Sequence, residues 1–204
     1  SNRDDREGIN WLLPGGSQED VAVDAGIRRA RAATLFILGL PGSTYIYQGE
    51  ELGLHEVGDI PAEGRQDPTF FRSDGGEIGR DGCRVPIPWS RSGASFGFGD
   101  SAPHMPQPVW FGDYSVEAED GDPASTLAVY REALRVRRDI QAPEHMEWVD
   151  SPADVLHFVR PNGWHVVTNF GTELVELPEG EVLAVSTPLV DGKLAGEATA
   201  WVKN

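Results

Sequence analysis

The chain has 204 residues, of which 39% are hydrophobic, so a protein that is disordered throughout is excluded and one or two globular domains are expected. Its 17 basic and 33 acidic residues give a formal charge of −16, with an isoelectric point near 4.6. A negative field of this size repels phosphate backbones and anionic lipids, so we predict no nucleic-acid partner and no membrane-surface role. No apolar stretch reaches the roughly 20 residues that a membrane-spanning helix needs.

The single cysteine, Cys83, excludes an intramolecular disulfide and a cysteine-based zinc site, and the histidines show no metal-ligand spacing. The sequence therefore predicts no cofactor and no metal. A reducing cytoplasm is the simplest compartment for such a chain. Residues Ser1 to Arg6 lack the apolar core of a signal peptide, and they start without Met inside a polar stretch. We interpret this start as that of a fragment.

The first helical pattern runs from about Glu19 to Leu38, after Ser17 and Asp20 in a capping arrangement, and it ends at Gly39. Residues 43–47 are rich in β-formers and predict a short buried strand, so that helix and strand form a unit of the parallel-sheet kind. Polar residues follow this strand: Gln48, Glu50 and Glu51. They either support the site through hydrogen bonds or begin the next helical turn.

Residues 54–121 show no periodicity but carry several aromatic residues, so we predict an ordered excursion rather than disorder. A second helix is predicted over 124–138. Its amino terminus would be capped by Asp122, with Pro123 in the first position, and its apolar stripe would hold Leu127, Tyr130 and Leu134.

After Asp139 the pattern changes to six short runs of β-forming residues separated by Pro, Gly and Asn turns. The runs are 146–149, 155–159, 164–168, 173–177, 181–185 and 198–202. This spacing predicts a small antiparallel β-sandwich over residues 140–204, packed on the preceding helix.

Three separated segments carry a resemblance to a known family: residues 32–53, Gly79-Arg-Asp-Gly-Cys-Arg-Val-Pro-Ile-Pro-Trp89 and residues 122–138. In this order they resemble the last helix–strand unit of the barrel, the loop that follows it and the final barrel helix of α-glucosidases in the α-amylase superfamily (glycoside hydrolase family 13). The resemblance implies the last helix–strand units of a TIM (β/α)8 barrel in residues 1–139, followed by the β-sandwich domain in 140–204.

The resemblance also implies retaining hydrolysis of α-glucosidic bonds in small oligosaccharides, which needs two carboxyl groups about 5 Å apart. The family carries its nucleophile and acid/base on earlier barrel strands and a third Asp in an Asn-His-Asp motif. This sequence contains no Asn-His-Asp, so all three carboxylates are expected to be missing and the fragment to be inactive. Apolar faces within residues 30–47 would then lack their barrel partners, and the fragment is expected to self-associate.

Arg84 is the candidate substrate-binding residue, because it matches the Arg of the family's Arg-Asp-x-x-Arg-x-Pro motif and its fixed donors suit sugar hydroxyls. Arg80 and Asp81 are predicted to form a structural ion pair that shapes this loop. Glu63 is a weaker candidate for a second sugar. Trp89 and Phe96 either stack on a sugar or pack beneath the loop.

Other readings of the sequence differ in class. An isomerising or transglycosylating enzyme shares the same motifs. A non-catalytic, glucosidase-like binding protein is a second alternative, although the retained Arg84 motif argues against a degenerate site. A free sugar-binding module over 140–204 is a third, but that segment lacks a row of exposed aromatic residues.

Overall fold

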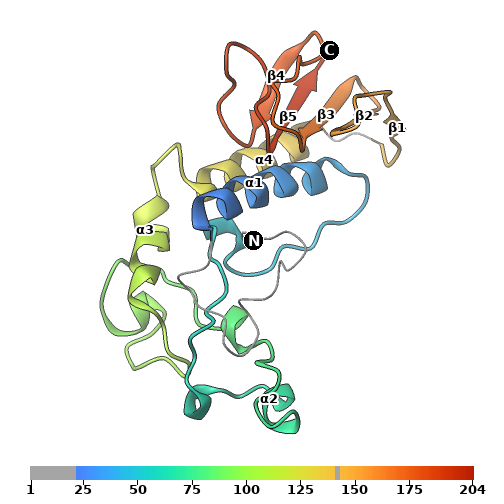
Figure 1. The fold of residues 1–204 in the computed structure, drawn as a ribbon. Helices are drawn as coiled ribbons and strands as arrows, with labels where there is room; N and C mark the ends of the chain where they lie inside the picture. Colours follow the sequence, from blue (N-terminus) through green and yellow to red (C-terminus); the bar gives the residue numbers. More distant parts are fainter. Residues whose placement is uncertain (1–21, 141–142) are drawn as a thin grey trace. The chain divides into compact units, whose positions relative to one another are not determined.

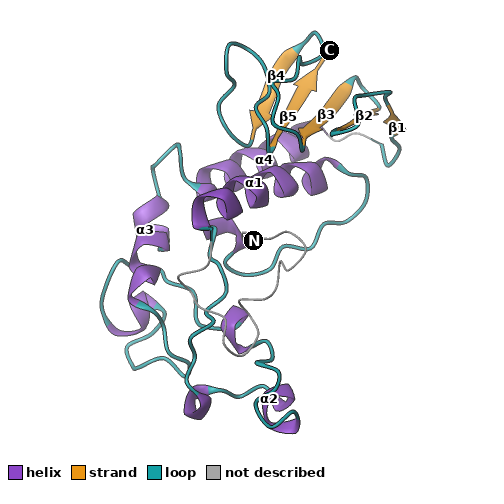
Figure 2. Cartoon of the chain, in the orientation of Figure 1, coloured by secondary structure: helices purple, strands orange, loops and turns teal. Residues whose placement is uncertain are grey.

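The computed structural model describes residues 22–140 and 143–204 (Figures 1 and 2). The predictions for the amino terminus and for the Ser17–Asp20 cap lie outside these residues. The described residues fall into two compact units. One contains Ile27–Tyr47 and Pro123–Asn204, and the other contains the described residues up to Gly26 together with Gln48–Asp122. Each unit is described by itself.

The first unit places two helices on one five-stranded antiparallel sheet. Figures 1 and 2 show α1 (Val23–Gly39) and α4 (Thr126–Ile140) next to each other beneath the strands. The strand order is β1-β2-β3-β5-β4, and every neighbouring pair is antiparallel. The strands are β1 (Glu147–Trp148), β2 (Val155–Arg160), β3 (Trp164–Asn169), β4 (Glu181–Val185) and β5 (Ala198–Lys203). The predicted antiparallel β-structure after residue 140 is therefore confirmed.

The helices and the sheet share a core of large, fully buried side chains. Leu35 and Leu38 of α1 pack with Phe158, Trp164 and Trp201 of the sheet. Because removing such side chains from water is the main favourable term in folding, this cluster is what holds the helices to the sheet.

Two hydrogen bonds fix the position of α1 on the sheet. The Thr199 hydroxyl donates to the backbone oxygen of Ala32 at 2.8 Å, and the Trp201 indole Nε1 donates to that of Leu35 at 3.0 Å. Both acceptors lie on one face of the helix, one turn apart. The packing of α1 on the sheet therefore includes hydrogen bonds, which depend on direction, in addition to apolar contacts.

The opposite face of the sheet is covered by loop residues instead of a second sheet within the described residues. Val155, Val167 and Ala200 of the strands are buried there with Leu194. The predicted strand 173–177 is reduced to a single bridge between Val175 and Leu194. The sandwich prediction is right about the layer facing the helices, whereas the second layer is made of loops.

Both predicted helices are present. The second, α4, differs from the prediction in its capping residue and in one residue of its buried apolar stripe. Ser125, rather than Asp122, caps α4, because its Oγ accepts a hydrogen bond from the Ala128 N–H at 3.0 Å. Leu127 and Tyr130 are buried as predicted, but Leu134 is 43% exposed. Its place on the buried stripe is taken by smaller side chains, Ala133 and Val136.

The predicted buried strand 43–47 is wrong. These residues belong to no strand, and Tyr45 is 94% exposed. A strand needs a neighbour to bond its backbone, and no described strand pairs with this segment. Instead, Arg137 of α4 donates to the Thr44 hydroxyl and the Gly42 backbone oxygen, each at 2.6 Å.

The second unit consists of loops and short helices around its own small core, as the lack of periodicity predicts. That core is built from side chains of separate loop segments: Val57, Ile60, Val85, Met105 and Phe111. The helices are η4 (Glu50–Leu52), η5 (Ala62–Gly64), α2 (Pro68–Arg72), η6 (Asp81–Cys83), η7 (Ala94–Gly97), η8 (Val109–Tyr114) and α3 (Val116–Glu119). Across the described ranges of both units, no helix is long and apolar enough to cross a membrane.

Arg160 is a buried cation that ties the sheet to the last residue of α1 and to the segment after α4. It is 4% exposed, and its guanidinium donates to the backbone oxygens of Gly39, Pro143 and His145 at 2.7–2.9 Å. The same group lies 5.4 Å from the centre of the Trp164 ring. Three carbonyls in different directions match a planar fork of donors, and a lysine ammonium cannot reproduce this arrangement.

We therefore expect Arg160→Lys to lower the free energy of unfolding by about 1–3 kcal/mol, because buried carbonyls lose their donors. The measurement is urea unfolding followed by tryptophan fluorescence. Arg138→Lys is the matched control, since the Arg138 side chain is 75% exposed and its change should be close to neutral. Equal stability of the two variants would show that the three carbonyl contacts contribute little.

Candidate functional site

Asp67 is the centre of the loop structure in the second unit. It is 4% exposed and caps the short helix α2, with Oδ1 accepting the Thr69 N–H at 2.9 Å. Its other oxygen, Oδ2, accepts the Arg80 N–H at 3.1 Å and lies 3.3 Å from Nη1 of Arg84. One carboxylate thus joins residues that are far apart in the sequence.

These contacts stabilise the charged form of the carboxylate. The N–H groups of Thr69 and Arg80, followed by the Thr69 side chain, lower the pKa of Asp67 from 3.8 to about 2. Removal from water acts in the opposite direction, and the Arg84 charge adds a smaller lowering effect. Asp67 is therefore a permanent anion at neutral pH, suited to holding a cation in place.

Asp81 holds the backbone of Asp67 in place by accepting hydrogen bonds from it and from the residue before it. It is 1% exposed, and its Oδ2 accepts the N–H groups of Gln66 at 2.9 Å and of Asp67 at 3.0 Å. The predicted Arg80–Asp81 ion pair is wrong, because Asp81 is occupied by backbone donors and Arg80 is exposed. The ion pair of this loop is instead Arg84–Asp67.

The backbone and one end of the side chain of Arg84 are held in place, while part of its guanidinium is exposed to solvent. Its backbone N–H donates to the Asp81 oxygen at 2.9 Å, and its side chain, 37% exposed, is held at one end by Asp67. A guanidinium has five N–H donors, and the Asp67 contact uses the Nη1 end. The remaining donors make no hydrogen bond to a described residue and are available to a ligand.

Two glycines allow the loop to close around the carboxylates. Gly79 has a φ of +69°, and a Cβ there would lie 2.7 Å from Cβ and Cγ of Asp67. A Cβ on Gly82 would lie 2.3 Å from the backbone oxygen of Val57. Any larger residue at either position must displace the chain, so both glycines are required by the geometry.

Arg65 and Glu56 form a second, structural layer near this loop. Arg65 is 8% exposed and donates to the backbone oxygens of Gly58 and Ile78, each at 3.0 Å. Burial raises the pKa of Glu56, and the Arg65 charge opposes this shift. Because the Arg65 donors already have backbone acceptors, we assign it to loop structure rather than to ligand binding.

The polar residues after segment 43–47 begin a helical turn, which is one of the two roles predicted for them. Glu50 and Glu51 lie in η4, and a carboxylate oxygen of Glu51 accepts the Gly49 N–H at 2.8 Å. Gly49 itself has a φ of +91°, so the turn depends on a glycine. No described contact places Gln48 beside Arg84.

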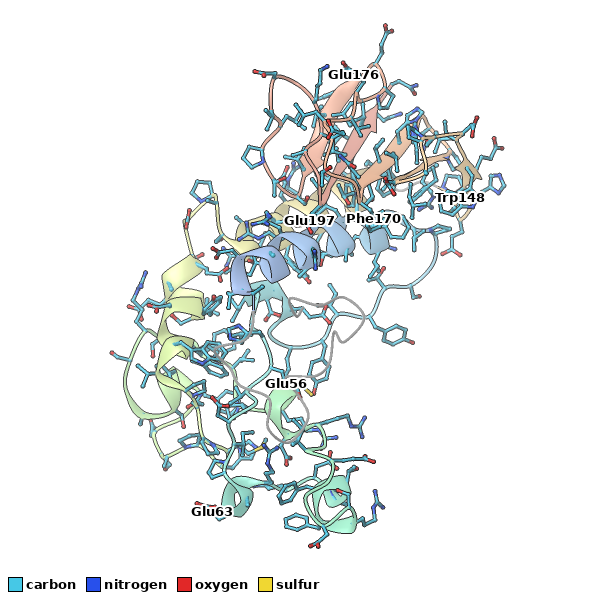
Figure 3. The ribbon with its side chains drawn as sticks, viewed as in Figure 1. Glu56, Glu63, Trp148, Phe170, Glu176 and Glu197 are labelled. Atoms are coloured by element: carbon cyan, nitrogen blue, oxygen red, sulfur yellow. The ribbon has the colours of Figure 1, made fainter. Side chains whose placement is uncertain are left out.

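Among the described residues, the weaker candidates form no hydrogen bond or ring contact with Asp67 or Arg84. Glu63 is exposed on η5 and points away from the ribbon (Figure 3). Phe96 packs on the small core against Phe111, so the packing role predicted for it is confirmed. Trp89 is 50% exposed, and its backbone N–H donates to the Phe96 oxygen at 2.8 Å.

Sequence reasoning missed Asp67, although a signal was present. Asp67 precedes Pro68, and an acidic residue directly before a proline in the first helical position is a typical helix cap. That signal predicts a cap but not the pairing with Arg84, which depends on how the loop closes. As for metals, the described part of the chain brings together no group of three His, Cys, Asp or Glu side chains that could hold an ion.

Comparison with known proteins gives one consistent family. The family model of the α-amylase catalytic domain matches residues 17–145. A probable α-glucosidase of Rhizobium meliloti (strain 1021) is 35% identical over 136 residues, 66% of this chain and 24% of that protein. Maltase A1 of Drosophila melanogaster is 33% identical over 97% of this chain and 38% of its own length.

A solved structure agrees with these relatives. The crystal structure of the α-glucosyl transfer enzyme XgtA is 29% identical, with a TM-score of 0.72, over 97% of this chain and 38% of that one. The chain therefore spans between 24% and 38% of the length of these proteins.

The lowered pKa of Asp67 predicts a component of acid stability. The anion stabilises the fold fully above about pH 4, and this contribution is lost as the pH falls from 3.8 toward about 2. Asp67→Asn removes that component, so its unfolding free energy should change less between pH 4 and pH 2 than that of the unaltered chain. Asp59→Asn, at an exposed carboxylate, is the control and should keep the original pH dependence. Identical profiles for all three proteins would contradict the assignment.

Proposed function

The chain belongs to the α-amylase family, and from this membership we propose that it forms the carboxy-terminal part of a retaining α-glucosidase acting on small oligosaccharides. The observation that carries the proposal is the family match over residues 17–145, which includes the whole Asp67–Arg84 loop. Hydrolysis of α-glucosidic bonds is the activity that best fits the names of the relatives. A cytoplasmic location stays a prediction.

In this proposal residues 1–139 are the end of a (β/α)8 barrel and residues 140–204 are a carboxy-terminal β-domain whose sheet packs on α1 and α4. The five-stranded antiparallel sheet after residue 147 supports the second assignment. The match of the α-amylase catalytic-domain family over residues 17–145 supports the first. The exposed side chains of Tyr45, Ile46 and Tyr47 favour self-association of the chain on its own.

Arg84 is proposed to bind the sugar at the reacting subsite. Asp67 holds one end of the guanidinium, so the side chain loses little freedom when a ligand arrives. The outer N–H groups would donate to sugar hydroxyls, and a charged donor makes stronger hydrogen bonds than a neutral one. Arg84 acts in this proposal as a binding residue and not as an acid, base or nucleophile.

A second candidate function is transfer of the glucosyl group to a sugar rather than to water. The similarity to the α-glucosyl transfer enzyme XgtA favours it, since the two chains are 29% identical over the aligned region, which is 38% of that protein. Both reactions use the same retaining chemistry and differ in the acceptor. Chromatography of the products from maltose separates them, because transfer gives longer or rearranged oligosaccharides and hydrolysis gives glucose alone.

The 204-residue chain by itself is expected to be inactive. Retaining hydrolysis needs two free carboxyl groups about 5 Å apart, one to protonate the bond and one to capture the sugar. The buried pair on this loop cannot serve, because Asp67 and Asp81 both accept backbone N–H groups. Release of nitrophenol from an α-glucoside by the purified chain should equal the buffer blank. Release above that blank, abolished by Arg84→Ala, would overturn the expectation.

In the longer enzyme, Arg84→Lys should lower kcat/KM about ten- to a hundredfold, because charged hydrogen bonds contribute roughly 1.5–3 kcal/mol. Arg84→Ala should be worse, since Asp67 then loses its cationic partner. Arg80→Lys is the matched control on the same loop, where the side chain is exposed, and it should keep the original efficiency. Unchanged kinetics in Arg84→Ala together with a lower melting temperature would make Arg84 a structural residue.

A further inference from the structure

The turn that joins β2 to β3 contains an exposed asparagine followed by a glycine. Arg160 and Trp164 are paired directly across the two strands, so the connection consists of the three residues from Pro161 to Gly163. Asn162 and Gly163 have φ values of +72° and +68°, which glycine adopts freely and asparagine tolerates. The local sequence therefore suits the turn, and the Asn162 side chain is left open to water.

An exposed Asn-Gly pair has the groups needed for spontaneous deamidation. The main-chain nitrogen of Gly163 can attack Cγ of Asn162, because a glycine has no Cβ that hinders its own nitrogen. A bond forms between this nitrogen and Cγ, the bond from Cγ to Nδ2 breaks, and the amide leaves as ammonia with the Gly163 proton. Water then opens the succinimide ring that results. Opening at Cγ gives aspartate, and opening at the main-chain carbonyl gives isoaspartate.

Asn204 holds this turn closed in the folded chain. Its main-chain N–H donates to the Gly163 oxygen at 3.1 Å, and a Cβ on Gly163 would collide with Oδ1 of Asn204. Its Nδ2 lies 3.0 Å from Nε2 of His165, which ties the same residue to β3. The succinimide ring bonds the Gly163 nitrogen to two carbons of Asn162 and so fixes the ψ of that residue. The hairpin must therefore open before the ring can close.

We propose that Asn162 is a deamidation site whose reaction is limited by opening of the β2–β3 turn, which Asn204 holds closed. The product changes the sheet as well as the charge. Isoaspartate adds one main-chain carbon to the three-residue connection and places a carboxylate in the turn that Asn204 contacts. Arg160 is 4% exposed and Trp164 1%, so neither end of the turn can move without disturbing the core. The melting temperature of the isoaspartyl chain should therefore be lower.

Asn169 on β3 provides a comparison within the same chain. It is 1% exposed, and its Nδ2 donates to the backbone oxygens of Glu173 at 2.8 Å and of Leu194 at 3.3 Å. The next residue is Phe170, whose side chain hinders attack by its own nitrogen. We therefore expect no reaction at Asn169 over the time in which Asn162 reacts.

The test is incubation of the 204-residue chain at neutral pH, followed by digestion after Glu residues and mass spectrometry. The digestion releases residues 148–173 as one peptide, in which Asn162 and Asn169 are the two asparagines. A synthetic peptide of residues 157–167 gives the rate without the fold. We expect this peptide to react about ten- to a hundredfold faster than the folded chain, a difference of about 1.4–2.8 kcal/mol in the free energy of opening.

Three outcomes would overturn the proposal. The first is a rate in the folded chain that equals or exceeds that of the peptide, because the turn would then not limit the reaction. The second is the absence of product from the folded chain after about a hundred half-lives of the peptide. The third is reaction at Asn169 instead of Asn162.

Variants test the role of Asn204. Asn204→Pro removes the N–H that binds Gly163 and the amide that contacts His165, so the folded variant should deamidate about tenfold faster. Lys203→Gln is the matched control at the neighbouring position and should keep the original rate. Asn162→Gln should abolish the mass change, and circular dichroism establishes that each variant is folded. Equal rates in Asn204→Pro and Lys203→Gln would refute the role of Asn204.

Discussion

The loop unit depends on one buried charge, the carboxylate of Asp67. It gathers the N–H groups of Thr69 and Arg80 and the guanidinium of Arg84, which come from two stretches of chain more than ten residues apart. A buried carboxylate is costly unless all of its acceptor positions are used, so the loop has one favourable way to close. Asp81 completes this arrangement by accepting the N–H of Asp67 itself.

The other unit uses a different balance of forces. Its sheet holds α1 through large apolar side chains, and the polar contacts of Thr199 and Trp201 with helix carbonyls select the position of the helix. Arg160 then binds the backbone oxygen of Gly39, the last residue of this helix. Burial provides most of the stabilisation here, whereas in the loop unit, with its small core, hydrogen bonds to charged groups determine the shape.

The periodicity of the sequence predicted the helices and strands that bury one regular face. The two long helices and five of the six strands were evident in the sequence, because each buries a regular face. The exceptions follow from contacts that no local pattern contains. Residues 43–47 have strand propensity without a described neighbour, and residues 173–177 form one bridge only. Arg84 was identified by its motif, but its partner Asp67 was not, because a pairing across 17 positions depends on loop closure.

Two glycines, Gly79 and Gly82, restrict which residues the loop segment from Gly79 to Arg84 can contain. Gly79 and Gly82 lie where a Cβ would collide with Asp67 or with the Val57 backbone, so the residues between Gly79 and Arg84 are restricted by space as well as by chemistry. A chain that keeps both glycines, Asp81 and Arg84 therefore keeps the closed loop, and the closed loop presents the guanidinium in one orientation. A relative with a similar sequence in this segment is therefore expected to have the same loop backbone. The residues that shape that backbone are also the ones that position Arg84 for a ligand.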